Sequence, residues 1–228
     1  MTKDYTPTTI DDFVFYNDAT EATVRAIIDG SFAIPAQGVT GLLLYGPAGT
    51  GKTALANKLP EFIEVARGGT TPQVDIYECG EGNDDGASMI KNITAKLKVS
   101  TFTTSGIAFY VFDEVDHLSK KTMQALKGIL NNKRSLFILT TNHIDRVDPV
   151  LQDRCVVLPM LQAPAVKWLP LARRIANDNG LSEETDDNLL MRCKQSEGSA
   201  RKLYRHIVST AISVKAMTSQ CLQSTTAV

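Results

Sequence analysis

The stretch "GLLLYGPAGTGKT", residues 41–53, decides how this sequence folds. Its first five residues carry no charge and are mostly apolar, which is typical of a strand buried in a parallel sheet. The next eight fit the pattern G-x-x-x-x-G-K-[ST] in full. In that pattern, glycines let backbone N–H groups turn toward an anion, and the following helix presents its N-terminus to phosphates. The stretch therefore predicts a phosphate-binding loop made of Gly46, Pro47, Ala48, Gly49, Thr50, Gly51, Lys52 and Thr53.

Two side chains at the end of this loop have separate expected roles. We expect Lys52 to reach the β- and γ-phosphates of a nucleotide, and the Thr53 hydroxyl to ligate Mg²⁺. The alternative is a glycine-rich turn that binds no nucleotide. The complete pattern, with a strand before it and a helical pattern after it, favours nucleotide binding.

The second signal is "IAFYVFDEVD", residues 107–116, in which a buried strand ends at two acids. Asp113 is placed to hold the Mg²⁺ of the phosphate site, usually through water. Glu114 is placed to polarise an attacking water as a general base. Taken alone, the pair would equally well be two acids at a strand end. Together with the loop about 60 residues upstream, they favour nucleotide hydrolysis.

A third strand, "FILTTNH" at 137–143, also ends in polar residues. In a parallel sheet it could lie beside both the phosphate loop and the acidic strand, because all carboxyl ends meet at one edge. The amide of Asn142 would then orient the water near the γ-phosphate. In isolation, an asparagine at this place fits an ordinary turn.

The rest of the chain predicts an α/β fold followed by helices. Apolar runs and helical patterns alternate up to about residue 160, which is the signature of βαβ units. We expect strands at 41–45, 73–78, 107–112, 135–140 and 155–159, and helices at 20–29, 52–59, 86–98 and 120–130. Three further helices follow at 163–178, 183–195 and 199–216, with Ser182 as the N-cap of the second. The predicted domains are 1–161, a nucleotide-binding α/β domain, and 162–228, a helical lid whose tail frays.

Composition narrows the function classes. The net charge of −1 argues against a strongly basic nucleic-acid binder, although local basic patches remain possible. The four cysteines are widely spaced and form no C-x-x-C pair, so we expect no zinc site and reduced thiols. The start of the chain has no apolar signal-peptide core, and no apolar run approaches the ~20 residues of a membrane span. We therefore expect a cytoplasmic protein with no membrane partner.

With these motifs in place, the chain resembles the AAA+ ATPases of the clamp-loader group, which includes the replication factor C small subunits and the phage clamp-loader ATPase subunits. "YTPTTIDDF" (5–13) is similar to the family's opening motif, and "VFDEVDHLSKKTMQAL" (111–126) to Walker B with its following helix. "TTN" (140–142) corresponds to sensor 1 and "GSARKLYR" (198–205) to sensor 2. "LQDRC" (151–155) resembles L-x-S-R-C, the most selective of these motifs.

The resemblance implies ATP as the nucleotide and a P-loop AAA+ parallel sheet with a small helical lid. It implies that Arg154 is an arginine finger acting in trans on the neighbouring subunit, which requires a head-to-tail ring or spiral. It also implies that Arg201 is sensor 2, reaching from the lid to the nucleotide. The alternatives are a surface arginine at 154 and a solvated helix-face arginine at 201. Tyr5, Pro7 and Ile10 suggest the adenine pocket.

Several positions depart from the family. The family's further helical collar has no room after the lid, so we expect a collarless chain. Thr6 and Asp153 replace the arginine of Y-R-P and the serine of S-R-C. Lys127 and Gly128 replace paired arginines, and Asn131 replaces the acid that follows them. These changes leave the ATPase motifs intact and weaken the case for a true sliding-clamp loader.

In clamp loaders, helix N-termini that line a central channel track DNA phosphates. The corresponding segments here are "GASMIKN" and "LSKKTMQ", with Lys91, Lys120 and Lys121 as candidate phosphate contacts or, alternatively, as solvated lysines. One hypothesis is a DNA-associated ATPase of clamp-loader type that loads an unidentified protein client. The other is a regulatory AAA+ matchmaker whose ATP-bound homo- or hetero-oligomer is a scaffold on DNA, or which remodels a protein partner. The subunit number, the client and a polar switch residue on the second strand stay unassigned.

Overall fold

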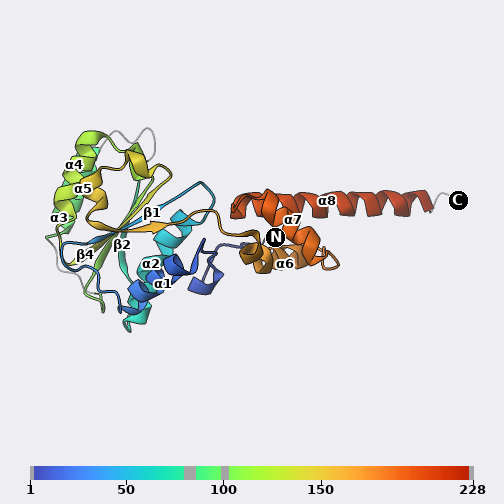
Figure 1. Ribbon diagram of the computed structural model, residues 1–228, viewed down its shortest axis with the longest axis horizontal. Helices are drawn as coiled ribbons and strands as arrows, with labels where there is room; N and C mark the ends of the chain where they lie inside the picture. Colours follow the sequence, from blue (N-terminus) through green and yellow to red (C-terminus); the bar gives the residue numbers. More distant parts are fainter. Residues whose placement is uncertain (1–2, 80–85, 99–102, 226–228) are drawn as a thin grey trace. The chain divides into compact units, whose positions relative to one another are not determined.

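The computed structural model describes residues 3–79, 86–98 and 103–225, and side chains up to residue 217. The chain forms two compact units, shown in Figure 1. The α/β unit consists of Thr6–Pro47 and Gly51–Leu161, and the helical unit of Met1–Tyr5, Ala48–Thr50 and Gln162–Val228. The α/β unit ends at Leu161, and the first residues and the tip of the phosphate loop group with the helices.

A five-stranded parallel sheet forms the centre of the α/β unit, in the order β2-β3-β4-β1-β5. Its strands are β1 (Gly41–Tyr45), β2 (Gln73–Glu78), β3 (Ala108–Asp113), β4 (Ser135–Thr141) and β5 (Cys155–Pro159). The middle strands are buried on both faces, as the uninterrupted apolar runs of the sequence require. The register pairs Leu44 with Thr140, so the carboxyl ends of β1 and β4 lie level.

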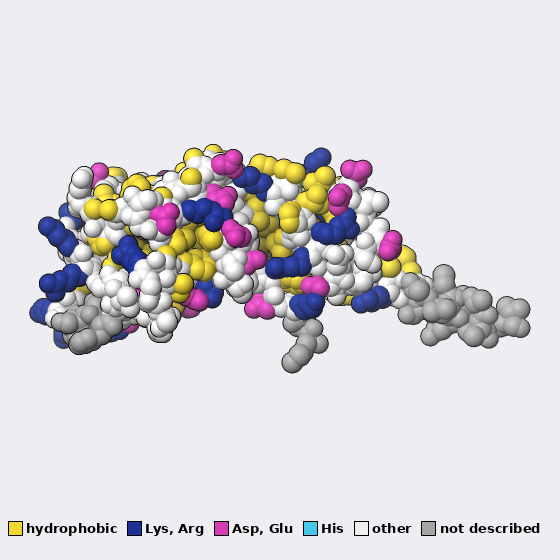
Figure 2. All heavy atoms as spheres, turned by 90° about the horizontal axis from the view of Figure 1, so that it is seen from below, with side chains coloured by type: hydrophobic (Ala, Val, Ile, Leu, Met, Phe, Trp, Pro, Cys, Tyr) yellow, Lys and Arg dark blue, Asp and Glu magenta, His cyan; other side chains and the backbone are white. Residues whose placement is uncertain are grey.

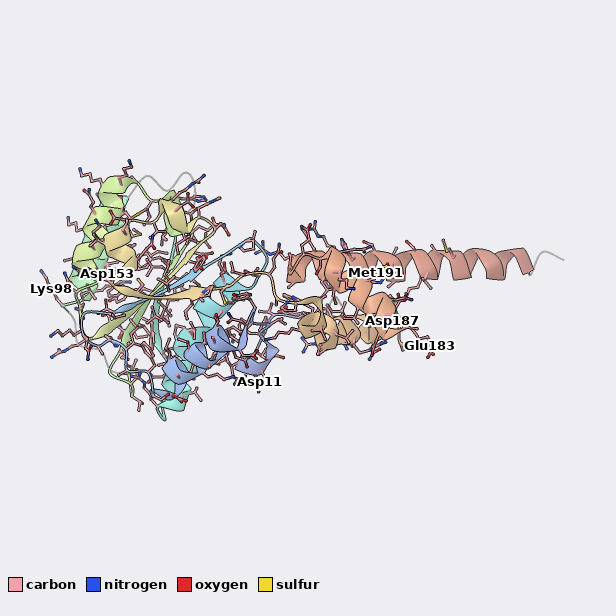
Figure 3. The ribbon with its side chains drawn as sticks, in the orientation of Figure 1. Asp11, Lys98, Asp153, Glu183, Asp187 and Met191 are labelled. Carbon is pink, nitrogen blue, oxygen red and sulfur yellow. The ribbon has the colours of Figure 1, made fainter. Side chains whose placement is uncertain are left out.

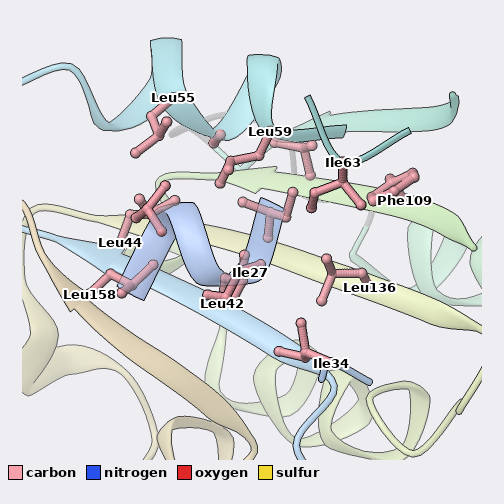
Figure 4. Close-up of a cluster of buried hydrophobic side chains, with 14 of the residues drawn as sticks. Ile27, Ile34, Leu42, Leu44, Leu55, Leu59, Ile63, Phe109, Leu136 and Leu158 are labelled. Carbon is pink, nitrogen blue, oxygen red and sulfur yellow. The ribbon is translucent and has the colours of Figure 1, made fainter. Parts of the chain in front are cut away.

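Helices cover both faces of this sheet (Figure 1). One face packs against α1 (Asp18–Asp29) and α2 (Lys52–Ala66), with Ile27, Leu55 and Leu59 fully buried (Figure 4). The other packs against α3 (Gly86–Lys96), α4 (Lys120–Ile129) and α5 (Pro149–Gln152). Short 3-10 turns complete the unit: η1 (Ile10–Asp12), η2 (Val115–His117) and η3 (Ile144–Arg146). Two layers of helices around a parallel sheet confirm the predicted α/β fold class.

The helical unit contains η4 (Ala165–Trp168), α6 (Leu169–Asp178), α7 (Asp186–Gln195) and α8 (Ala200–Thr225). The predicted apolar face of α8 is buried at Leu203, Ile207 and Ala211. Within the described residues, no helix is long and apolar enough to cross a membrane.

Two local predictions in the helical unit were wrong. Thr185, and not Ser182, is the N-cap of α7, because its side chain accepts a hydrogen bond from Asn188 N. The third helix was predicted to end at residue 216, whereas α8 is helical to Thr225. In the α/β unit, α2 likewise continues to Ala66, past its predicted end at residue 59.

Candidate functional site

The phosphate loop adopts a backbone that only glycine allows at its key positions. Gly46 has φ of 150°, and a Cβ there would lie 2.1 Å from the carbonyl oxygen of Met160. Gly51 has φ of 93° and forms the N-cap of α2. A left-handed backbone is energetically unfavourable for residues that have a Cβ atom. The glycines of the motif are therefore steric requirements of this turn. The loop thereby delivers the N-terminus of α2 to the edge where β1 ends.

Lys52, the first residue of α2, is held by the loop itself. Its side chain is only 7% exposed, and its Nζ donates a hydrogen bond to the carbonyl oxygen of Pro47 at 2.9 Å. The amine is therefore oriented toward the loop, where a phosphate bound by the backbone would meet it. At the tip of the loop, within the helical unit, the Gly49 carbonyl accepts a hydrogen bond from Ala200 N at 3.1 Å.

The structure brings the two expected magnesium ligands together. The Thr53 hydroxyl donates to the Asp113 carboxylate, 2.9 Å from Oδ1 and 3.2 Å from Oδ2. A hydroxyl beside a carboxylate is the all-oxygen donor set that Mg²⁺ prefers. The residues present therefore fit Mg²⁺, which Thr53 and Asp113 would hold.

Thr140, on the neighbouring strand, organises both acids. Its hydroxyl donates to Asp113 Oδ1 and accepts from Glu114 N at 3.0 Å. That bond holds Glu114 in the left-handed region at φ of 60°, where a residue with a Cβ is strained. The Glu114 side chain is 45% exposed, and its Oε2 lies 3.6 Å from His117 Nδ1. The strained turn thus directs the carboxylate outward from the sheet edge, where water is accessible.

A second buried hydrogen-bond network fixes the turn that carries Asn142. The Thr141 hydroxyl donates to Asp116 Oδ1 at 2.7 Å and accepts from His143 N at 2.9 Å. The Asp116 side chain is fully buried, and its Oδ2 has no hydrogen-bond partner within the described residues. Sequence reasoning identified Asn142 but missed Asp116 and Thr141 as its supports. The only signal was position: Thr141 ends β4, and Asp116 lies in η2, three residues after the end of β3.

Arg154 lies at the opposite edge of the sheet from the phosphate loop of its own chain. It precedes β5, and its carbonyl accepts hydrogen bonds from Thr40 N and Gly41 N, just before β1. The loop begins after the far end of β1, about 13 Å or more along the strand at roughly 3.3 Å per residue. Its guanidinium Nη1 donates to Asn131 Oδ1 and to the Lys127 carbonyl. Arg154, the predicted finger, therefore lies on a different surface from the phosphate loop of the same chain.

Two of the remaining predicted site residues, Arg201 and Tyr5, lie in the helical unit. Arg201 is exposed in the first turn of α8. Tyr5 packs against helical residues: its ring centroid is 5.7 Å from that of Tyr204, and Arg174 lies over its face at 5.6 Å. Burial and the neighbouring Asp178 carboxylate raise the pKa of the Tyr5 hydroxyl, so it stays protonated. Pro7 and Ile10, the other two residues suggested for the adenine pocket, belong to the α/β unit, where Ile10 packs against the core.

The N-termini of α3 and α4 lie side by side in the α/β unit. A Cβ at Gly86, the first residue of α3, would meet the Thr122 hydroxyl in the first turn of α4 at 2.2 Å. Lys91, Lys120 and Lys121 are exposed on these two helices. Other cations and anions alternate over the surface seen in Figure 2, in keeping with the near-neutral net charge. The segment 80–85, where a switch residue on the second strand was sought, lies outside the described residues.

The comparisons with known proteins agree with this geometry. The family described as "ATPase family associated with various cellular activities (AAA)" matches residues 42–160, which include the phosphate loop, both acids and Arg154. The replication factor C small subunit 1 of Pyrobaculum arsenaticum is 25% identical over 97% of this chain and 65% of its own. The clamp-loader resemblance predicted from the sequence motifs is thereby confirmed.

Solved structures give the same fold. The Holliday junction branch migration motor RuvB of Thermotoga maritima matches 88% of this chain and 63% of its own, with a TM-score of 0.63 at 17% identity. A DNA polymerase III gamma subunit-related protein of the same organism matches 79% of this chain and 59% of its own, with a TM-score of 0.53 at 17% identity. The chain spans 57% to 65% of the length of three curated replication factor C relatives.

Proposed function

This chain belongs to the AAA family of ATPases, and from that premise we propose that it hydrolyses ATP at the interface between two head-to-tail subunits. One subunit supplies the phosphate loop, the acids and Asn142, and the next supplies Arg154. The energy of ATP hydrolysis would drive DNA-associated loading or remodelling of a protein client. The similarity to replication factor C subunits supports this part of the proposal.

In this proposal the residues of one subunit prepare the reaction at the carboxyl edge of the sheet. The loop N–H groups and Lys52 bind the β- and γ-phosphates of ATP, with Thr53 and Asp113 as the ligands of Mg²⁺, which would offset phosphate charge. Glu114 accepts a proton from water as the water oxygen bonds to the γ-phosphorus. The bond from that phosphorus to the β,γ-bridging oxygen breaks, and ADP and phosphate form. Asn142 orients the water through its amide.

The position of Arg154 is the observation that carries the interfacial part of the proposal. It lies at the amino edge of the sheet, beside Gly41 and far from its own phosphate loop. A guanidinium is always charged and offers planar donors to phosphate oxygens, so it suits the role of stabilising the γ-phosphate of a neighbour. A two-fold dimer would pair this edge with itself, whereas a head-to-tail assembly pairs it with the neighbour's nucleotide.

The proposed DNA contact is electrostatic and independent of base sequence. The adjacent N-termini of α3 and α4 present partial positive charge, and Lys120 and Lys121 add full charges at the same place. Such contacts release counterions, with a slope of log affinity against log salt of roughly −0.9 per phosphate neutralised. Replacing both lysines with alanine should weaken duplex binding and flatten this slope. Replacing the exposed Lys133, which lies beyond the other end of α4, should change neither duplex affinity nor the salt slope. If the Lys133 variant lost as much affinity as the double variant, the proposed surface would be refuted.

The direct test of the proposed function is Arg154→Ala. We expect ATP binding to be retained, because the phosphate loop is untouched, while turnover falls by roughly 10³-fold or more. Fluorescent-nucleotide titration and phosphate release measure the two quantities. Sizing with and without an ATP analogue and duplex DNA tests the assembly. Full turnover in the variant with ATP bound, or a monomer under every condition, would contradict the proposal.

A further inference from the structure

The guanidinium of Arg154 is held by the C-terminal end of α4 in its own chain. Its Nη1 donates to the side-chain Oδ1 of Asn131 and, at 3.4 Å, to the carbonyl oxygen of Lys127. The last carbonyl groups of a helix carry partial negative charge and lack intrahelical donors, which favours a cation at this place. Arg154 therefore has a defined resting position before any neighbouring subunit is present.

The backbone segment that leads into Arg154 is tied to the same helix. Lys127 Nζ pairs with Asp148 Oδ2 at 2.8 Å, and Asp148 Oδ1 accepts from Val150 N to cap α5. Asp153, labelled in Figure 3, is the exposed C-cap of α5 and directly precedes the finger. Lys127 and Asn131 thus hold the two ends of the segment from Asp148 to Arg154. The first contact fixes its backbone, and the second fixes the guanidinium.

The chemistry of the acceptor at residue 131 decides how firmly the finger is held. An amide oxygen accepts a hydrogen bond from a guanidinium without neutralising its charge. A carboxylate at this point would form a charge-assisted bond about twice as strong, and a bidentate one if both oxygens engage. We propose that Asn131 is a positioning residue that aligns Arg154 for the neighbouring subunit and, being neutral, allows it to leave for the γ-phosphate. This role rests on the proposed function of Arg154.

The test is Asn131→Asp, which keeps the shape of the side chain and changes only its charge. We expect kcat to fall about threefold to tenfold, because the finger must break an ion pair to reach the phosphate. Nucleotide affinity should not change, because residue 131 is far from the phosphate loop. The matched control is Asn132→Asp, whose Oδ1 accepts from Arg134 N at 2.8 Å and does not face Arg154. Turnover equal to wild type in Asn131→Asp, or an equal loss in the control, would overturn the proposal.

Mixing distinguishes a positioning defect from a general structural one. A chain with Asn131→Asp is impaired as a finger donor, but its own ATP site is intact. A chain with Glu114→Gln lacks the base but donates a normal finger. The mixture should therefore recover turnover above the sum of the two separate chains, and no recovery would count against a role at the finger.

Arg154→Ala, measured in parallel, separates this inference from the proposed function. If Arg154→Ala retains turnover, the interfacial function itself is wrong. If it loses turnover while Asn131→Asp does not, only the role of Asn131 is wrong.

Discussion

Replacing Thr140 with valine should impair both stability and turnover, because one buried hydroxyl serves the two acids of the site. The side chain is 1% exposed. It donates to the Asp113 carboxylate and accepts from Glu114 N at 3.0 Å. Valine keeps the volume but can do neither.

The magnitude follows from these two bonds. A hydrogen bond to a charged group contributes about 1.5–3 kcal/mol, and leaving a buried N–H unpaired costs about 1–3 kcal/mol. The buried methyl group that valine adds offsets these losses by about 0.8 kcal/mol. We therefore expect a net loss of about 2–5 kcal/mol in the free energy of unfolding, which lowers the urea midpoint by about 1–2 M. Glu114 would also lose the bond that holds its strained backbone, so turnover should fall as well.

Urea unfolding and phosphate release measure the two effects. The control is Thr103→Val, which removes only neutral hydrogen bonds, to the Ile107 carbonyl at 3.1 Å and to Ser105 Oγ at 3.4 Å, just before the other end of β3. It should cost about 1 kcal/mol and leave turnover unchanged. If Thr140→Val matched this control in both assays, the network would not support the acids as described.

Three further predictions concern single features. Gly46→Ala should abolish ATP binding in a nucleotide titration, because its Cβ would clash with the Met160 carbonyl; retained affinity would show that the loop can rearrange. Asp12 accepts N–H bonds from the two preceding threonines, which lower its pKa from 3.8 to about 2. The stabilisation that the Asp12 carboxylate gives the fold is therefore complete above about pH 4 and is lost as the pH falls through about 2. In urea unfolding, Asp12→Ala should cost about 1 kcal/mol at pH 7 and almost nothing at pH 2. Burial raises the pKa of the Cys155 thiol to about 12, so at pH 8 this thiol should react with a thiol reagent only after unfolding. Fast labelling of Cys155 in the native chain would contradict its burial.

The sheet was predictable from sequence because its strands are short, apolar and bounded by turns. The local sequence could not decide between two candidate N-cap residues for α7. Ser182 and Thr185 both precede acids, and both look like N-caps. The structure uses Thr185, since Arg192 pairs with Glu184 and holds that residue in the turn before α7. Such a contact joins residues in different elements and leaves no trace in a local pattern.

The end of α8 shows a different limit. Among the side chains that are described, up to residue 217, the last buried one on α8 is Ala211. The predicted helix ended soon after that residue. No glycine or proline interrupts the chain from residue 200 to residue 225. Backbone hydrogen bonds can therefore continue the helix without a buried face.

The site residues that belong to a sequence motif could be predicted. The contacts that depend on how neighbouring strands pair could not. Thr53 and Asp113 follow from their motifs, and the structure joins them at 2.9 Å. Thr140 became a partner of Asp113 only through the pairing of β3 with β4. The contact between Asn131 and Arg154 joins the end of α4 to the residue before β5, and the sequence marked Asn131 only as an unusual residue.

If Arg154 acts in trans, one chain is not a complete ATPase. The most direct test mixes Arg154→Ala chains with Glu114→Gln chains and measures phosphate release against each variant alone. The finger of the second chain would serve the intact acids of the first, so we predict that the two inactive proteins restore turnover together. A mixture as inactive as its components, although they co-assemble with ATP, would contradict it.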